Sequence, residues 1–210
     1  MKTKMKMKIL VTGFEPFFGR PINPSWTAAQ RAVQKNKEAG EPYDMVCYQI
    51  PVLWHGANGK DGAWEAIQAA VRQEKPDCLI CMGESAGIKE IHFETIAINK
   101  AGDVKDNADQ QFECSQTGEV EIEKGGITSK RTTLPEQAIL EYNRLYPNHT
   151  PVQASDNAGR YLCNFVFYKS LTRYSDAPIP HRGFIHIGSE EQADDVSLLI
   201  QLIAKAVKEK

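Results

Sequence analysis

Segments with the pattern of buried strands alternate with segments that have the pattern of helices along the first half of the chain. The predicted strands are short and mostly apolar, whereas each helix is marked by a proline at its start or by apolar residues at helical spacing. This β-α-β-α-β order favours a largely parallel sheet with helices on its faces, and therefore the α/β class. The predicted strands are residues 7–14, 45–52 and 77–84, and the predicted helices are residues 24–39 and 63–75.

The second half of the chain continues with mixed elements after a long polar stretch. Residues 100–133 show no strong periodicity and are too many for a simple connection, so we expect a hairpin or a partly mobile arm near a site or a subunit contact. The length of 210 residues suits a single domain spanning residues 1–210. The later predicted elements are a strand at 91–99, a helix at 135–146, a strand at 152–155, a helix at about 161–174, a strand at 183–188 and a closing helix from about 190.

The charge of the chain is nearly balanced. It has 25 Lys and Arg against 27 Asp and Glu, a net charge of −2, so no long-range field favours nucleic acid or an anionic membrane as a partner. A small or neutral partner fits better. The basic start, MKTKMKMKIL, has too few apolar residues before Gly13 and Glu15 for a signal peptide or a membrane span.

The cysteines are odd in number and scattered, which fits a reduced, cytoplasmic protein better than a disulfide scaffold. Cys78 and Cys81 form a C-x-x-C motif inside a predicted buried strand, where their side chains would point to opposite faces. We therefore expect both to pack in the core and not to share a zinc ion or a disulfide. The five cysteines are Cys47, Cys78, Cys81, Cys114 and Cys163.

Cys163 is a candidate nucleophile because of its place between a strand and a helix. The strand at 152–155 ends, residues 156–159 form a turn, and the thiol falls in the first turn of the next helix. Ligands of open α/β sheets collect at such carboxyl ends of strands, and a helix N-terminus favours a thiolate. The alternative is that Cys163 packs with the apolar residues that follow it.

His186 and Glu94 are the candidate partners of this thiol. His186 stands near the carboxyl end of the predicted strand GFIHIG, and the other four histidines lie in turns or beside proline and charged residues, without metal-ligand spacing. Glu94 is flanked by apolar residues and would be costly to bury without a partner, so it could orient the imidazole. The alternatives are a core histidine and a carboxylate on the exposed face of its strand.

Five motifs surround these residues: GFEPF at 13–17, NPSW at 23–26, ETIAIN at 94–99, AGRYLCN at 158–164 and GFIHI at 183–187. Together, from about Lys8 to Gly188, they resemble the pyroglutamyl peptidase I (pyrrolidone-carboxylate peptidase) family of cysteine peptidases. The resemblance implies that Glu94, Cys163 and His186 form a catalytic triad.

The resemblance implies further properties. The fold would be a three-layer α/β/α sandwich around a mostly parallel twisted sheet, of the phosphorylase/hydrolase-like type. The activity would be that of a cysteine exopeptidase that removes an N-terminal pyroglutamyl residue through a thioester, without a metal or another cofactor. The substrate would be a small peptide with a blocked N-terminus, and the enzyme would be a cytoplasmic homo-oligomer, a dimer or a tetramer.

A pocket for the pyroglutamyl ring is also implied. By resemblance it uses Phe14, Phe17 and Tyr161, whose aromatic faces suit a small uncharged ring. The two phenylalanines could also anchor their loop against the core. A fourth pocket position is Glu84, where the family has a glutamine that helps to read the lactam.

The chain departs from the family pattern at several positions. Glu84 replaces the glutamine, Ile88 and Thr95 replace arginines, and a further arginine near residue 104 is missing, where Lys105 could supply some of the charge. Two interpretations of Glu84 follow: it is protonated and imitates the amide, or the pocket prefers a ligand with a cation or an extra donor. The alternative function is therefore a catalytically silent or altered-specificity relative that takes a different small acyl or amide ligand.

Overall fold

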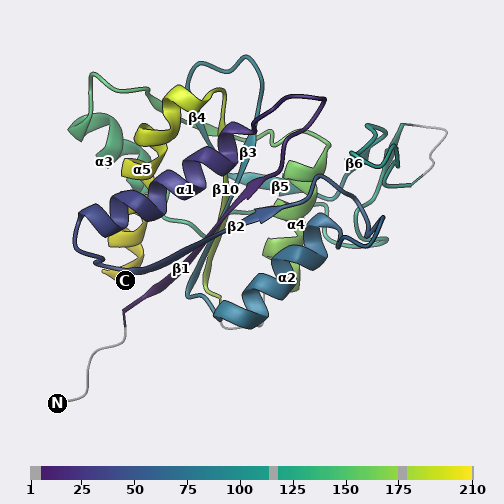
Figure 1. The fold of residues 1–210 in the computed structure, drawn as a ribbon, viewed down its shortest axis with the longest axis horizontal. Helices are drawn as coiled ribbons and strands as arrows, with labels where there is room; N and C mark the ends of the chain where they lie inside the picture. Colours follow the sequence, from purple (N-terminus) through teal and green to yellow (C-terminus); the bar gives the residue numbers. More distant parts are fainter. Residues whose placement is uncertain (1–5, 114–117, 175–178, 210) are drawn as a thin grey trace.

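The computed structural model describes residues 6–113, 118–174 and 179–209, and its centre is a twisted sheet of six strands (Figure 1). The strand order is β2-β1-β3-β10-β4-β9. Four neighbouring strands are parallel, whereas β4 is antiparallel to β10 and β9 is parallel to β4. The strands are β1 (Lys8–Phe14), β2 (Asp44–Ile50), β3 (Cys78–Glu84), β4 (Ile91–Glu94), β9 (Val152–Ser155) and β10 (His181–Ile187).

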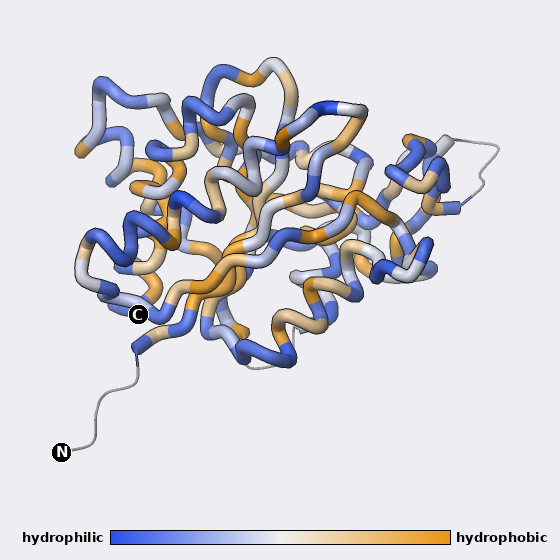
Figure 2. The backbone as a smooth tube through the Cα atoms, in the orientation of Figure 1, coloured by the Kyte–Doolittle hydropathy of each residue, from blue (hydrophilic) through white to orange (hydrophobic). Residues whose placement is uncertain are grey.

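Helices cover both faces of this sheet, so the predicted three-layer arrangement is confirmed. α1, α3 and α5 bury one apolar cluster against one face, and α2 and α4 bury a second cluster against the other. Figure 2 shows apolar residues along the inner strands and hydrophilic residues along the outer sides of the helices. The helices are α1 (Pro24–Glu38), α2 (Ala63–Glu74), α3 (Gln137–Leu145), α4 (Leu162–Arg173) and α5 (Ala193–Lys208), the last preceded by a 3-10 turn, η1 (Glu190–Gln192).

The helix ends follow from their residues. The side chain of Asn23 accepts a hydrogen bond from the backbone N–H of Ser25 at 3.1 Å and so caps α1. Pro24 occupies the first helical position, in agreement with the proline expected at the start of this helix. α5 has acidic residues in its first turn and lysines in its last, which complement the helix dipole.

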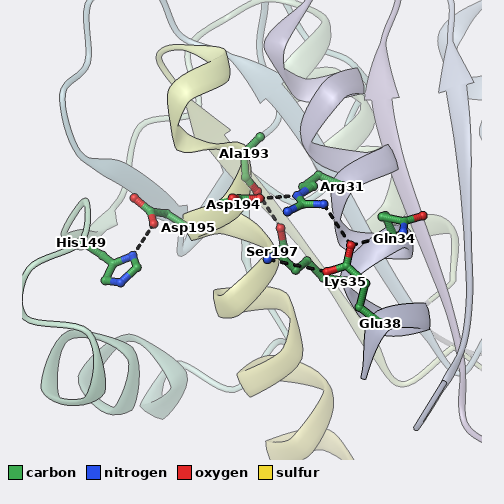
Figure 3. Close-up of polar contacts among 9 residues, drawn as sticks. All are labelled: Arg31, Gln34, Lys35, Glu38, His149, Ala193, Asp194, Asp195 and Ser197. Carbon is green, nitrogen blue, oxygen red and sulfur yellow. Dashed lines mark hydrogen bonds and ion pairs between the residues drawn. The ribbon is translucent and has the colours of Figure 1, made fainter. Parts of the chain in front are cut away.

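Polar contacts join α5 to its neighbours on the first face (Figure 3). Arg31 of α1 pairs with Asp194 of α5, and Nδ1 of His149 lies 2.6 Å from Oδ1 of Asp195. These pairs lie at the surface, where each contributes at most about 1 kcal/mol. His149 thus has a structural contact, and among the described residues no cluster of three His, Cys, Asp or Glu side chains could hold a metal ion.

The predicted strand at 91–99 is in fact two strands in different sheets. Thr95 interrupts it, because its N–H and hydroxyl both donate to the carbonyl of Ser155, at 2.7 and 2.8 Å. β4 ends before this break, and β5 (Ile96–Ile98) pairs with β8 (Ser129–Arg131) outside the central sheet. The break ends β4 at Glu94.

Residues 100–133 contain a short antiparallel pair of strands, which agrees with the expected hairpin. β6 (Ala101–Gly102) pairs antiparallel with β7 (Glu119–Val120). The indole N–H of Trp54 donates to the carbonyl of Val104 at 3.0 Å, which attaches the arm to the second face. Cys114 lies outside the described residues.

Cys78 and Cys81 pack on opposite faces of β3, as predicted. Both are fully buried and unpaired, and they belong to the two different apolar clusters. Burial raises the pKa of both thiols, that of Cys81 to about 12, so neither is a reactive thiolate at neutral pH. In the part of the chain that the structure describes, no helix has the length and apolar character needed to cross a membrane.

Candidate active site

Cys163 lies in the first turn of α4, as the sequence predicted. β9 ends at Ser155, a turn containing Gly159 with a φ of +79° follows, and Tyr161 is extended before the helix begins. The N–H groups of a first helical turn have no acceptor within the helix, and the dipole is positive there. This position therefore favours a thiolate and can stabilise a developing oxyanion.

The thiol fits against the end of β3 because residue 83 is a glycine. A Cβ atom added to Gly83 would lie 2.6 Å from Sγ of Cys163 and 2.9 Å from the ring of Phe184. Real Cβ atoms do not approach other heavy atoms so closely, so any side chain here would displace the thiol or the ring. Gly83 thus reserves the space in which Cys163 sits.

His186 and Glu94 meet on one face of the sheet. Nδ1 of His186 lies 2.8 Å from Oε1 of Glu94 and donates to it when it carries the proton. Glu94 pairs in antiparallel register with Phe184, two residues before His186, which puts both side chains on the same face. His186 is 4% exposed and Glu94 is fully buried, so the alternative of a surface carboxylate is wrong.

The charges around His186 favour its protonated form. Burial alone would lower the pKa of His186, but the neighbouring Cys163 thiolate, its hydrogen bond to the ring and the contact with Glu94 together raise it to about 9. The second carboxylate oxygen of Glu94 is buried without a hydrogen-bond partner among the described residues. A buried carboxylate of this kind is stabilised by a neighbouring cation such as the imidazolium. The raised pKa of His186 therefore favours an imidazolium at neutral pH, between the thiol of Cys163 and the carboxyl group of Glu94.

Asn164 fixes the start of α4, a role that the sequence interpretation did not assign. Its amide N–H₂ donates to the carbonyls of Ile98 and Lys100, at 2.9 and 2.8 Å, and its Oδ1 accepts from the N–H of Ile98 at 3.0 Å. The side chain is fully buried. A buried polar residue directly after the thiol, within an apolar helix, was the sequence signal for this anchor.

A cavity of about 180 Å³ opens beside the thiol. Its wall is largely aromatic, with ring centroids of Phe17 and Tyr161 5.1 Å apart. The hydroxyl of Tyr161 donates to the carbonyl of Lys105 at 3.0 Å, and burial raises the pKa of this phenol. The lining residues are Phe14, Phe17, Phe18, Arg20, Asn23, Val52, Glu84, Ala86, Tyr161, Leu162 and Cys163.

The structure thus brings all four predicted pocket residues to one cavity, but it gives Glu84 a partner that the sequence interpretation missed. Nη1 of Arg20 forms a short hydrogen-bonded ion pair with Oε1 of Glu84. Arg20 lies in the loop between β1 and α1, 64 residues before Glu84. No local pattern in the sequence signals a pair of such separation.

A larger groove lies elsewhere, with a volume of about 1100 Å³. It is lined by residues at the amino ends of β1, β2 and β10, among them Lys8, Asp44 and His181. Ligands of α/β sheets bind at the opposite, carboxyl ends. The small cavity beside Cys163 is therefore the better candidate site, despite its size.

A family model described as pyroglutamyl peptidase matches residues 7–208. The chain belongs to the pyroglutamyl peptidase family. The pyrrolidone-carboxylate peptidase of Brevibacillus brevis is 32% identical over 206 residues, which cover 95% of this chain and 89% of that protein. The pyrrolidone-carboxylate peptidase of Thermococcus kodakarensis is 31% identical over 207 residues, which cover 96% of this chain and 93% of that protein.

Solved structures of pyroglutamyl peptidases have the same fold. The crystal structure of Bacillus amyloliquefaciens pyroglutamyl peptidase I superposes with a TM-score of 0.80 at 28% identity, over 98% of both chains. The pyrrolidone carboxyl peptidase of Pyrococcus furiosus gives a TM-score of 0.75 at 28% identity, over 96% of this chain and 100% of that one. The likeness spans the whole central sheet and both helical layers.

The other departures from the pyroglutamyl peptidase pattern lie outside the cavity. Thr95 is buried, with its hydroxyl donated to the carbonyl of Ser155. Lys105 pairs with Asp109 at 3.4 Å on the surface. The described residues that line the cavity do not include Thr95, Lys105 or Ile88. Of these departures from the family pattern, only Glu84 lies in the cavity wall.

Proposed function

We propose that the chain is a cysteine exopeptidase that removes an N-terminal pyroglutamyl residue from small peptides. The observation that carries this proposal is the buried hydrogen bond from His186 to Glu94, beside a thiol that opens into an aromatic cavity. Membership of the pyroglutamyl peptidase family supports both the reaction and the substrate.

Acylation would begin with attack by the Cys163 thiolate on the carbonyl carbon that joins pyroglutamate to the next residue. As the C–S bond forms, the negative charge moves to the carbonyl oxygen, which the free N–H groups in the first turn of α4 can stabilise. His186 then gives its proton to the leaving amine, and the C–N bond breaks. The product is a pyroglutamyl thioester on Cys163.

Deacylation would use the same groups in the reverse order. The neutral imidazole of His186 takes a proton from water while the water oxygen attacks the thioester carbonyl. The C–S bond breaks, pyroglutamic acid leaves, and the thiolate and imidazolium are restored. Glu94 holds the imidazole by Nδ1 and stabilises its charged form throughout.

The cavity supports a single small ring as the acyl group. Its volume of about 180 Å³ and its aromatic wall suit a small, uncharged ring beside Cys163. Phe14 is 2% exposed and packs in the second apolar cluster, so it lines the cavity and anchors its loop at the same time. These contacts support a role of Phe14 in the pocket and in anchoring the loop at the same time.

Hydrolysis of a pyroglutamyl-aminocoumarin reporter tests the proposal. We expect release of aminocoumarin by the wild type, none above background by Cys163→Ala, and unchanged release by the control Cys47→Ala, whose half-buried thiol lies away from the cavity. Activity that survives Cys163→Ala would refute the nucleophile. A wild type that does not hydrolyse the reporter, but whose Cys163 is alkylated rapidly, would be consistent with the triad and would favour the altered-specificity alternative.

Two expectations about the protein in the cell accompany this function. The first is the cytoplasm, whose reducing environment keeps a thiol nucleophile unoxidised; the cysteines that the structure describes are all unpaired. Assembly into a homodimer or homotetramer is the second expectation. Sedimentation at several protein concentrations measures it.

A further inference from the structure

Arg20 and Glu84 form the polar end of the cavity beside the thiol. Glu84 is the last residue of β3, directly after the glycine that accommodates Cys163, and its side chain is 11% exposed. Arg20 reaches it from the β1–α1 loop, with a side chain that is 52% exposed. Both residues line the same cavity as Cys163.

A tight turn holds Arg20 in this position. The N–H of Arg20 donates to the carbonyl of Phe17 at 3.2 Å, and the two central residues, Phe18 and Gly19, have φ values of +54° and +69°. Positive φ at both central positions is the pattern of a type I′ turn, and it is uncommon for a phenylalanine. The turn places Phe17 and Arg20 together at the cavity. The backbone conformation thus positions the guanidinium of Arg20 at the cavity wall.

The other polar side chains of the cavity wall already form hydrogen bonds within the protein. Asn23 donates to the carbonyl of Glu15 at 3.1 Å and accepts from the N–H and hydroxyl of Ser25 at 3.1 and 2.8 Å. Tyr161 donates its hydroxyl to the carbonyl of Lys105. Among the described wall residues other than Cys163, the Arg20–Glu84 pair therefore supplies the side-chain groups that can read a polar ligand.

A lactam ring carries an N–H donor next to a C=O acceptor on one edge. A carboxylate only accepts hydrogen bonds and a guanidinium only donates them, so the two side by side present the complement of that edge. The positive charge of Arg20 also offsets the negative charge of Glu84 close to the Cys163 thiolate. The pair thus requires neither a protonated Glu84 nor a cationic ligand.

We propose that Arg20 is a specificity-determining residue, which donates to the ring carbonyl of a pyroglutamyl group while the Glu84 that it holds accepts the ring N–H. This inference rests on the proposed function. It explains how Glu84 can replace a glutamine, whose amide would supply both a donor and an acceptor to the ring. It also disfavours a prolyl group, whose ring nitrogen is cationic and which has no ring carbonyl for Arg20.

The test compares Arg20→Met with the double variant Arg20→Met/Glu84→Gln, using pyroglutamyl- and prolyl-aminocoumarin. Arg20→Met should lower kcat/KM for the pyroglutamyl reporter about tenfold to hundredfold, the range of one charge-assisted hydrogen bond. The ratio of pyroglutamyl to prolyl hydrolysis should fall as well, because the unpaired carboxylate attracts the prolyl cation. Arg31→Met, which removes a surface arginine paired with Asp194, is the control and should change neither value.

The double variant separates ligand recognition from a structural role of the ion pair. A glutamine at position 84 supplies a donor and an acceptor by itself, so the double variant should regain about tenfold in kcat/KM over Arg20→Met. If the pair only held the loop, removing both partners would give no recovery. Thermal unfolding of each variant checks that it is folded.

Two results would overturn the inference while the proposed function stands. One is a wild type that hydrolyses the pyroglutamyl reporter together with an Arg20→Met variant of unchanged selectivity. The other is a double variant no more active than Arg20→Met. A wild type that hydrolyses no pyroglutamyl reporter would instead refute the proposed function, and the assignment of Arg20 with it.

Discussion

His186 and Glu94 are joined by a buried hydrogen bond of 2.8 Å between two antiparallel strands of the central sheet. Because the carboxylate takes Nδ1–H, the other ring nitrogen, Nε2, is left to exchange a proton with Cys163 and with the substrate. The bond thus fixes both the orientation and the tautomer of the imidazole.

Replacing Glu94 by glutamine should remove the charge and keep the size of the side chain. We expect kcat/KM to fall roughly 10²- to 10⁴-fold with a smaller change in KM, because the imidazolium loses its partner. NMR titration should also show a lower pKa for His186 than the value of about 9 in the wild type. An unchanged titration would mean that Glu94 does not stabilise the imidazolium.

The raised pKa of His186 also predicts how stability depends on pH. Its folded value of about 9 lies above the ordinary value of 6.5, so its contribution to stability is complete below about pH 6.5 and is lost as the pH rises through about 9. Urea unfolding at pH 6.5 and pH 9.5 should therefore show a larger loss for the wild type than for His186→Gln. The control is His149→Gln, which removes a surface ion pair worth at most about 1 kcal/mol, so its loss should stay within about 1 kcal/mol of that of the wild type. Equal losses in His186→Gln and the wild type would contradict the raised pKa.

Adding one methyl group at Gly83 should disable the site. Its Cβ would lie 2.6 Å from Sγ of Cys163, so we expect Gly83→Ala to displace the thiol and to lose about 1–3 kcal/mol of unfolding free energy. Gly87→Ala is a matched control, since its φ of +88° strains the backbone but its Cβ meets no atom within 4 Å. Reporter hydrolysis by the two folded variants separates the effect of crowding at the thiol, in Gly83→Ala, from the effect of backbone strain, in Gly87→Ala. Full activity in Gly83→Ala would show that the thiol has room to move.

Removing the side chain of Asn164 should loosen the start of α4. The substitution Asn164→Ala removes three hydrogen bonds to the part-buried backbone of Ile98 and Lys100, at a cost of about 2–4 kcal/mol in unfolding free energy. Asn157→Ala, in the exposed turn before the helix, should cost less than about 1 kcal/mol. Chemical denaturation of both variants measures the difference, and similar losses would refute the anchoring role.

The sequence predicted the parts of the site that depend on local order. The strand, turn and helix around Cys163 and the strand around His186 follow from apolar patterns and glycines, and the structure has them at nearly the same residues. The reversed direction of β4 was missed, although the short link of residues 85–90 after β3 leaves no room for the crossover that parallel strands need. The break at Thr95 depends on Ser155, far away in the chain, and no local pattern could show it.

The residues of the pocket could be predicted only in part, because one of their contacts joins segments far apart in the chain. Phe14, Phe17 and Tyr161 were assigned by resemblance, and the structure brings them to one cavity. The partner of Glu84 could not be read from the sequence, because an ion pair between a loop and a strand end depends on the path of the whole chain between them. The sequence left two interpretations of Glu84 open, and the contact with Arg20 adds a third.

Trapping the acyl-enzyme tests the central claim most directly. The protein would be mixed with pyroglutamyl-aminocoumarin, quenched in acid within the first turnovers, digested and mapped by mass spectrometry. The account predicts one pyroglutamyl group on the peptide that contains Cys163, absent from Cys163→Ala and unaffected by Cys47→Ala. Reporter hydrolysis with the acyl group on another residue, or undiminished hydrolysis by Cys163→Ala, would contradict it.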